Sequence, residues 1–293
     1  MKIPQSLFGA ALIAAGATQV LPAAGLQPAT LQAWKAYLSE VDVRTEQRAA
    51  STNRFLWTDE SEERARRVRR GEIVVAPVLG HGTEDVPNGL IHHWIGAVFV
   101  PGGSIEKLWA VVHDYDDYDR LYRPTVAASR TLACSESAQE FQMTWQRHVL
   151  FVNAALESRY QAHDVRVDSR RGYSVADTTE MRQIEGYGHT GQRLLPPDTG
   201  SGFIWRIRTI TRYEEREGGV MLEMEAIALT RDIPASLSWL VTPVVNHLSI
   251  NSLTSTLRQT RDAVMEVRGG SEGFASCPVH AGAVALAKAG GEE

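Results

Sequence analysis

Two adjacent histidines, His92 and His93, lie within an apolar run from Leu90 to Val100 that is predicted to be a β-strand. Successive side chains of a strand point to opposite faces, so the two rings cannot hold one metal ion together without a bulge. One ring is expected to face the interior beside Trp94, and His92 and Trp94 are therefore candidate ligand contacts. The simpler alternative, a histidine that only completes a hydrogen bond within the sheet, is the commoner one.

Charged residues alternate along two later strands. Arg206 and Arg208 share one face of the first strand, and Glu223 and Glu225 share one face of the second. If the turn at 214–219 makes these strands neighbours, opposite charges lie across from each other on the solvent face, each pair contributing roughly 0.2–1 kcal/mol. The residues between them would then line the interior: Trp205, Ile207, Thr209, Leu222, Met224 and Ala226.

The alternative places the two arginines inside, where they would hold a carboxylate or phosphate head group. We favour the solvent face, because an unpaired buried arginine is costly. Other polar residues of the middle strands are expected to reach the interior, since a ligand site needs a few fixed polar groups among apolar walls. The candidates are Arg147, Arg159, Arg182, Glu185, Tyr187 and His189.

The acidic run Asp114–Asp119 alternates carboxylates with tyrosines. A hand-shaped calcium loop also needs a central glycine and a closing glutamate, and neither is present here, so an elbow between two helices with buried tyrosines is favoured. The sequence contains no Cys/His cluster with zinc spacing, no glycine-rich phosphate motif and no defensible Ser-His-Asp order. We predict no metal and no cofactor. Whether Cys134 and Cys277 pair is left open.

The overall charge argues against nucleic acid. The chain has 293 residues, 43% of them hydrophobic and 22% charged, with a formal net charge of −5. Nucleic-acid binding usually needs a concentrated basic surface, but the dense basic run Arg64–Arg70 follows the acids Glu60, Glu62 and Glu63. That pattern is typical of a solvated helix with opposite-charge neighbours.

The N-terminus has the pattern of a secretory signal. Lys2 precedes an apolar stretch from Leu7 to Val20, and small residues follow at 23–25. The stretch is short for a membrane span, which needs about 20 apolar residues. We predict a signal peptide over 1–24 and therefore export to the periplasm or the medium. The alternative is an ordinary buried N-terminal helix.

The rest of the chain divides into segments that differ in composition and hydrophobic pattern. A helical extension is expected over 25–71, beginning near Pro28, and a tail rich in glycine, alanine and serine over 269–293. Between them, one strand is followed by a short helix and elbow, then by six strands with tight joins and a long helix from Pro234. Such joins predict an antiparallel meander, so the fold class is α+β, with a curved antiparallel sheet wrapped around a long C-terminal helix.

This order resembles the START-like or polyketide cyclase/dehydrase (SRPBCC, Bet v 1-like helix-grip) superfamily. The resemblance rests on the strand Trp94–Pro101, on the elbow Ile105–Arg123 with its Asp114-Tyr115-Asp116, and on the ending Arg231–Trp239 with the helix that follows. It covers roughly residues 72–268 and implies a cavity between sheet and helix. The residues expected to bind a ligand there are His92, Trp94, Arg147, Tyr187, Trp205, Ile207, Met224, Trp239, Val244 and Leu248.

Three functions follow from this resemblance. The favoured one is an exported, non-catalytic carrier or sensor of a lipid-like molecule, with transient membrane contact and oligomeric state left open. The second is a cyclase/dehydrase-type enzyme, in which a group such as His92, Arg147, Tyr187 or Glu225 would transfer protons on a polyketide- or steroid-like substrate. The third is a scaffold whose own side chains fill the cavity.

Overall fold

The computed structural model describes residues 24–135, 138–149, 152–232 and 235–267, with only the backbone described at 24, 147–149, 152–154 and 235–246. Apart from residue 24, the predicted signal peptide lies outside the described residues, as does the predicted tail. No helix in the described part of the chain is long and apolar enough to cross a membrane.

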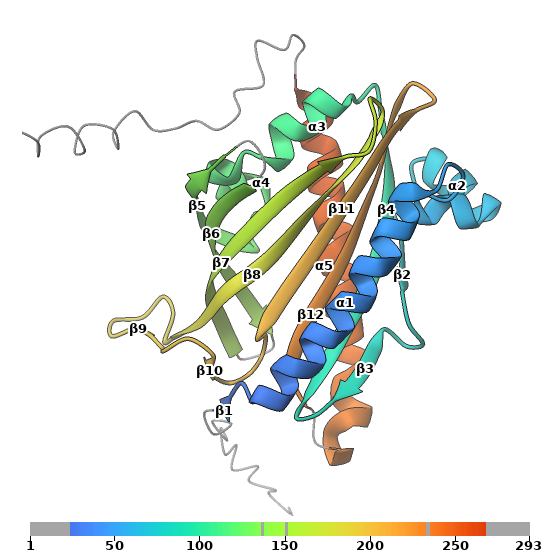
Figure 1. The fold of residues 1–293 in the computed structure, drawn as a ribbon. Coiled ribbons are helices and arrows are strands. Elements are labelled where there is room, and N and C mark those ends of the chain that lie inside the picture. Colours follow the sequence, from blue (N-terminus) through green and yellow to red (C-terminus); the bar gives the residue numbers. More distant parts are fainter. Residues whose placement is uncertain (1–23, 136–137, 150–151, 233–234, 268–293) are drawn as a thin grey trace, which may run out of the picture.

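One antiparallel sheet dominates the molecule (Figure 1). Its main path runs in the order β2-β4-β12-β11-β8-β7-β6-β5, so the last strand of the chain pairs with the strand that precedes the helical elbow. The strands on this path are β2 (Val74–Pro77), β4 (Gly89–Pro101), β5 (Val126–Cys134), β6 (Ala138–Val149), β7 (Val152–Arg166), β8 (Arg171–Glu185), β11 (Arg206–Arg216) and β12 (Gly219–Arg231). Short strands β3 (Thr83–Val86) and β9 (Arg193–Leu194) pair with β4 and β8, and β1 (Ala24–Gly25) pairs with β10 (Thr199–Gly200).

The hairpin between β11 and β12 shows how local sequence fixes the register. Arg216 pairs with Gly219, which leaves Glu217 and Gly218 as a two-residue loop. Both have positive φ, at 57° and 79°, as the tight hairpin turn that matches the strand twist requires. The predicted neighbours β11 and β12 are therefore confirmed.

The elbow after β4 is also confirmed. Helix α3 (Ile105–Val112) begins at Ser104, whose hydroxyl accepts a hydrogen bond from the Lys107 amide at 3.3 Å. A short 3₁₀ turn, η2 (Tyr115–Asp117), and helix α4 (Tyr118–Leu121) follow. Tyr115 and Tyr122 are buried, as expected of an elbow that packs against the sheet.

Helix α5 (Ala235–Glu266) covers one face of the sheet, here called the inner face. Leu253 and Leu257 pack in one cluster with Trp94, Val98 and residues of β12 and α3. Gly96 of β4 permits this contact, because a Cβ there would lie 2.7 Å from a methyl carbon of Leu257. A curved antiparallel sheet against a long C-terminal helix is the helix-grip arrangement predicted from the sequence.

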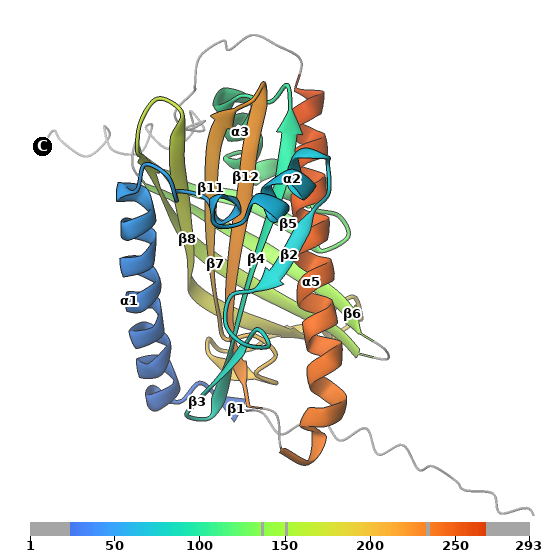
Figure 2. The same ribbon diagram turned by 90° about the vertical axis from the view of Figure 1, so that its right-hand side faces the viewer.

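The opposite, outer face is covered by the N-terminal extension (Figure 2). Helix α1 (Pro28–Ala50) buries Trp34, Leu38 and Val41 against β4, β8 and β12. A 3₁₀ turn, η1 (Trp57–Glu60), and helix α2 (Glu62–Arg69) follow it, and Phe55 beside η1 packs in a cluster with Ala97 and Met221. The sheet is thus the middle of three layers.

Candidate functional site

The centre of the inner face is lined by small side chains that remain half-buried, although α5 lies over this face. These residues, here called the floor, are Ser174, Ala176, Thr209, Thr211, Ala226 and Ala228. They lie side by side across three strands, since Thr209 is directly opposite both Ala176 and Ala226. On the outer face of the same strands, alternate residues such as Val175, Ile210 and Ile227 are buried beneath α1.

This difference between the two faces indicates room on the inner side. Small side chains fill little of the space under a helix, and protein interiors otherwise pack to the density of organic crystals. Floor residues that keep exposed surface therefore border a space that no described side chain fills. Three floor residues are alanines, and Ser174, Thr209 and Thr211 add hydroxyl groups, so the floor combines apolar surface with a few polar atoms.

Two polar residues of β4 lie at the edge of the floor. His92 is directly opposite Ala228 and Trp94 is directly opposite Ala226. Each residue is only 5% exposed. The Nδ1 atom of His92 and the Nε1 atom of Trp94 have no hydrogen-bond partner among the residues described.

The other ring nitrogen of His92 is held in the sheet. Its Nε2 lies 3.0 Å from the hydroxyl of Thr230, and that O–H group lies 3.0 Å from the carbonyl oxygen of Arg231, to which it can donate. Burial lowers the pKa of His92 to about 4, because the charged ring would lose its hydration. At neutral pH the ring is therefore uncharged.

Away from this edge, aromatic side chains fill the inner face. Tyr115 of the elbow stacks on Phe141, with ring centroids 4.0 Å apart, and Phe141 stacks on Tyr160 at 4.8 Å. The Nε1 atom of Trp145 donates to the hydroxyls of Ser158 and Tyr160 at 2.9 and 3.0 Å. These groups pack against and hydrogen-bond one another, whereas the floor residues remain half-buried.

A small polar cluster fixes the elbow to the sheet. His113 Nε2 lies 3.2 Å from Oδ1 of Asp164, whose other oxygen accepts from Gln139 Nε2 at 3.2 Å. The hydrogen bond from His113 holds the pKa of Asp164 below its usual range despite burial, which acts in the opposite direction. Both carboxylate oxygens of Asp164 have hydrogen-bond partners, so we interpret this cluster as structural.

A minor pocket lies where the chain crosses from β10 to β11. It is lined by Leu156, Met181, Gln183, Thr199, Gly202, Phe203, Ile204 and Trp205. Gln183 Oε1 accepts from the amide and hydroxyl of Ser201 at 2.7 and 2.8 Å, which fixes the loop. Phe203 remains 36% exposed.

The outer face carries a buried chain of polar side chains beneath α1. The hydroxyl of Tyr37 lies 2.6 Å from His93 Nδ1, and His93 Nε2 lies 2.6 Å from Oε1 of Glu225. Oε2 of Glu225 accepts from Arg212 Nη1 at 2.5 Å, and Arg212 Nη2 donates to Thr45 at 2.9 Å. His93 and Arg212 outweigh the effect of burial and hold the pKa of Glu225 well below its usual range. The charges of this outer network are paired, although Nε of Arg212 has no hydrogen-bond partner among the described residues.

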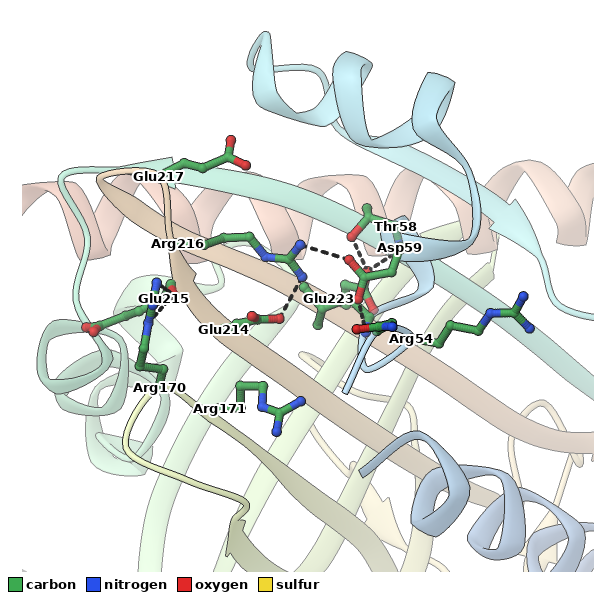
Figure 3. A network of polar contacts seen from close by, with 12 residues as sticks. Arg54, Thr58, Asp59, Arg170, Arg171, Glu214, Glu215, Arg216, Glu217 and Glu223 are labelled. Carbon is green, nitrogen blue, oxygen red and sulfur yellow. Dashed lines mark hydrogen bonds and ion pairs between the residues drawn. The ribbon is translucent and has the colours of Figure 1, made fainter. Parts of the chain in front are cut away.

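Glu223, two residues earlier in β12, holds the 3₁₀ turn η1 against the sheet (Figure 3). Its carboxylate accepts from the amides of Trp57 and Thr58 at 2.7 and 2.8 Å, and from the Thr58 hydroxyl at 3.0 Å. Burial raises its pKa, and these hydrogen bonds act in the opposite direction. Nearby, Arg216 bridges Asp59 at 2.8 Å and Glu214 at 2.6 Å.

The charged strands predicted to face solvent need one correction. Glu223 and Glu225 do lie on the face opposite α5, but they are 0% and 6% exposed. The N-terminal extension covers that face, which the sequence prediction treated as open. The arginines also have other partners than expected: Arg208 binds Asp177 at 2.7 Å and Arg206 binds Asp198 at 2.5 Å.

The structure places the predicted ligand contacts in several environments. His92, Trp94 and Met224 lie on the inner face and are buried, while Ile207 on the same face and Leu248 of α5 are half-buried. Trp205 borders the minor pocket and packs in the cluster under α1. Tyr187 lies in the turn after β8, beyond the sheet. Arg147, Trp239 and Val244 lie among the positions at which only the backbone is described.

Three residues of the buried outer network were missed in the sequence. Arg212 follows Arg206 and Arg208 at even spacing, so the strand pattern already places it on their face. Tyr37 and Thr45 lie four residues on either side of Val41, on the stripe of α1 that packs against the sheet. Helical spacing therefore contained the signal for both.

No family model and no curated protein matches this sequence. Among solved structures, a STAR-related lipid transfer protein from Xanthomonas axonopodis is 16% identical, with a TM-score of 0.41 over 62% of this chain and 98% of that chain. The Zhui aromatase/cyclase from Streptomyces sp. R1128 is 15% identical, with a TM-score of 0.38 over 61% and 97%. A truncated norcoclaurine synthase from Thalictrum flavum is 10% identical, with a TM-score of 0.36 over 63% and 100%. The function is therefore inferred from the residues of this chain.

Proposed function

We propose that this protein holds a mostly apolar small molecule between the floor and α5. The observation that carries the proposal is the floor itself, a set of small side chains that stay half-buried on a face covered by a helix. Binding an apolar molecule there would remove apolar surface from water at about 25 cal/mol per Å².

The surroundings of the floor support an apolar ligand. Met224 and Leu253 belong to the inner cluster beside it, and Ile207 continues it along β11. The half-buried hydroxyls of Thr209 and Thr211 on the floor supply the few polar atoms that orient a ligand in such a site. A molecule with a largely hydrocarbon body and a small polar part fits this combination.

The enzyme alternative has less support, because the proposed acid–base groups are placed or paired unsuitably. Glu225 lies on the outer face in an ion pair, and Tyr187 lies in a turn. His92 is on the inner face, but a pKa of about 4 makes it a weak proton acceptor at neutral pH. It can donate or accept hydrogen bonds without changing its charge.

We also propose export, on the predicted signal peptide over 1–24. Cys134 is disulfide-bonded, in keeping with an oxidising compartment. N-terminal sequencing of the protein after expression in its own cells tests this proposal. A start near residue 25 in the periplasm or medium would support it, and an intact Met1 in the cytoplasm would contradict it.

Native mass spectrometry of the purified protein, followed by lipid extraction, tests the binding function. A hydrophobic molecule retained in near-stoichiometric amount is expected, and a floor-filling variant, Ala226→Leu, should lose it. The control Val43→Ala changes an exposed side chain of α1 and should retain it. A protein that carries nothing and ignores fatty acids, phospholipids and sterol-like compounds would rule out the carrier function.

A further inference from the structure

Cys134 is the last residue of β5, the strand at one edge of the sheet (Figure 1). It is half-buried and disulfide-bonded. The sequence contains only one other cysteine, Cys277. Within a single chain the partner of Cys134 is therefore Cys277, a pairing that the sequence alone left open.

This pairing encloses the part of the chain that builds the candidate site. The chain between the two cysteines includes strands β6–β12 and helix α5, and therefore both the floor and the helix that covers its face of the sheet. Cys277 follows Val267, the last described residue, by ten positions. Ten extended residues span at most about 33–36 Å, so the bond limits how far this end of α5 can move from the end of β5.

The end of α5 and the end of β5 border the same elbow. On the side of α5, the hydroxyl of Tyr122 lies 3.0 Å from the hydroxyl of Thr260. On the side of β5, Oδ1 of Asp116 accepts a hydrogen bond from the amide of Thr131 at 2.7 Å. The connection between the two cysteines therefore joins two elements that the elbow already brings together.

The contacts of α5 indicate what such a connection does. The described half of the helix packs in the inner cluster through Leu253, Leu257 and Val264, together with residues of β4, β12 and α3. The small side chains of the floor add few packing contacts to this attachment. A covalent tether lowers the conformational entropy of the detached helix, because it closes a loop that would otherwise be a free end. It therefore favours the docked helix.

We propose that residues 268–277 form a covalent strap, which the disulfide between Cys134 and Cys277 closes and which holds α5 over the inner face. Closing the strap transfers two electrons and two protons from the two thiols to a disulfide oxidant, which becomes a dithiol. Reduction by a dithiol reverses this step and frees the end of α5. The proposal does not depend on the carrier function.

Peptide mapping without reduction tests the pairing. Trypsin releases Cys134 in the peptide 131–147 and Cys277 in the peptide 269–288. Mass spectrometry of the oxidised, alkylated chain should find these two peptides joined, and dithiothreitol should separate them. Alkylated Cys277, or Cys134 joined to a second copy of its own peptide, would overturn the proposal.

Hydrogen exchange of the amides from Leu253 to Val264 measures how often α5 leaves the sheet. Dithiothreitol should accelerate this exchange by roughly tenfold or more, because the freed chain end regains its entropy. The variant Cys277→Ser should exchange at the fast rate with or without dithiothreitol. The matched control Ser276→Ala keeps the bond and should follow the wild type in both conditions.

The amides of the β11–β12 hairpin distinguish a strap from a general stabilisation of the fold. Their exchange should accelerate less than that of α5, because both strands keep their neighbours β8 and β4 when the helix leaves. If the hairpin and α5 accelerate by the same factor, the bond stabilises the whole fold and the strap is refuted. Equal exchange of α5 in the oxidised and reduced protein would refute it as well.

Discussion

Replacing Ala228 by leucine tests whether the inner face is open. Ala228 is half-buried on a face covered by α5, and its cross-strand neighbours are His92 and Ile207. Above an open floor, the three added carbons gain burial at about 0.8 kcal/mol each, so the free energy of unfolding rises by up to about 2 kcal/mol. In a filled interior the same carbons overpack the core, and the free energy of unfolding falls by about 1–3 kcal/mol. The sign of the change separates a binding cavity from a filled scaffold.

Urea unfolding of the delipidated protein measures this change. The matched control is Ala97→Leu, because Ala97 is fully buried on the outer face in a cluster with Val74 and Met221. That control should lower the free energy of unfolding by about 1–3 kcal/mol in either case. A comparable loss in Ala228→Leu would refute the inference that the floor borders open space.

Three further predictions concern the groups around the site. Arg212→Met leaves Glu225 buried without its guanidinium, so the free energy of unfolding in urea should fall by about 3–5 kcal/mol. Burial lowers the pKa of His92 to about 4 from 6.5 in the unfolded chain. The neutral ring therefore makes its full contribution to the free energy of unfolding above pH 6.5. About 3 kcal/mol of stability is then lost as the pH falls through that interval, measured by urea unfolding at each pH. Glu223→Met removes the acceptor of two η1 amides, so limited trypsin digestion should cut faster after the exposed Arg54.

Each of these predictions has a control. Arg193→Met, in an exposed ion pair, should change stability by less than about 0.5 kcal/mol. His92→Phe should abolish its share of the pH dependence between 6.5 and 4, and an unchanged slope would contradict the assignment. Equal cleavage of wild type and Glu223→Met would mean that Glu223 does not hold η1. A double variant, Arg212→Met with Glu225→Met, should recover most of the single loss, since no unpaired charge remains.

The sheet could be predicted because its determinants are local. Alternation along β4, tight joins such as Glu217–Gly218 and the Ser104 cap each depend on a few neighbouring residues. Such features fix strands, turns and helix starts without knowledge of distant contacts. The meander order and the helix on its inner face followed from them.

The cover on the outer face could not be predicted in the same way. The extension over 25–71 is strongly charged, which is typical of an exposed segment. Its attachment depends on pairs far apart in sequence, such as Trp57 and Thr58 with Glu223. No local pattern indicates that a glutamate in a strand will accept hydrogen bonds from backbone amides 165 residues away.

For the candidate site, the sequence supplied the residues but not their faces. Alternation alone places His92 and His93 on opposite sides without saying which side is which. The assignment depends on which helix covers each face, since α5 lies over His92 and α1 lies over His93. Once that is known, both ring nitrogens of His93 have hydrogen-bond partners, whereas Nδ1 of His92 has none among the described residues.

The two faces of the sheet therefore have different roles. Beneath α1, charges are paired and large apolar side chains such as Trp34 and Ile210 are fully packed, so this layer contributes stability. Beneath α5, the small side chains of the floor provide fewer packing contacts, so this part of the sheet contributes less stability. If only the inner face were covered, the same surface would have to provide both the packing that stabilises the sheet and the space for a ligand. Because the extension stabilises the sheet from the outside, the inner face can remain open for a ligand.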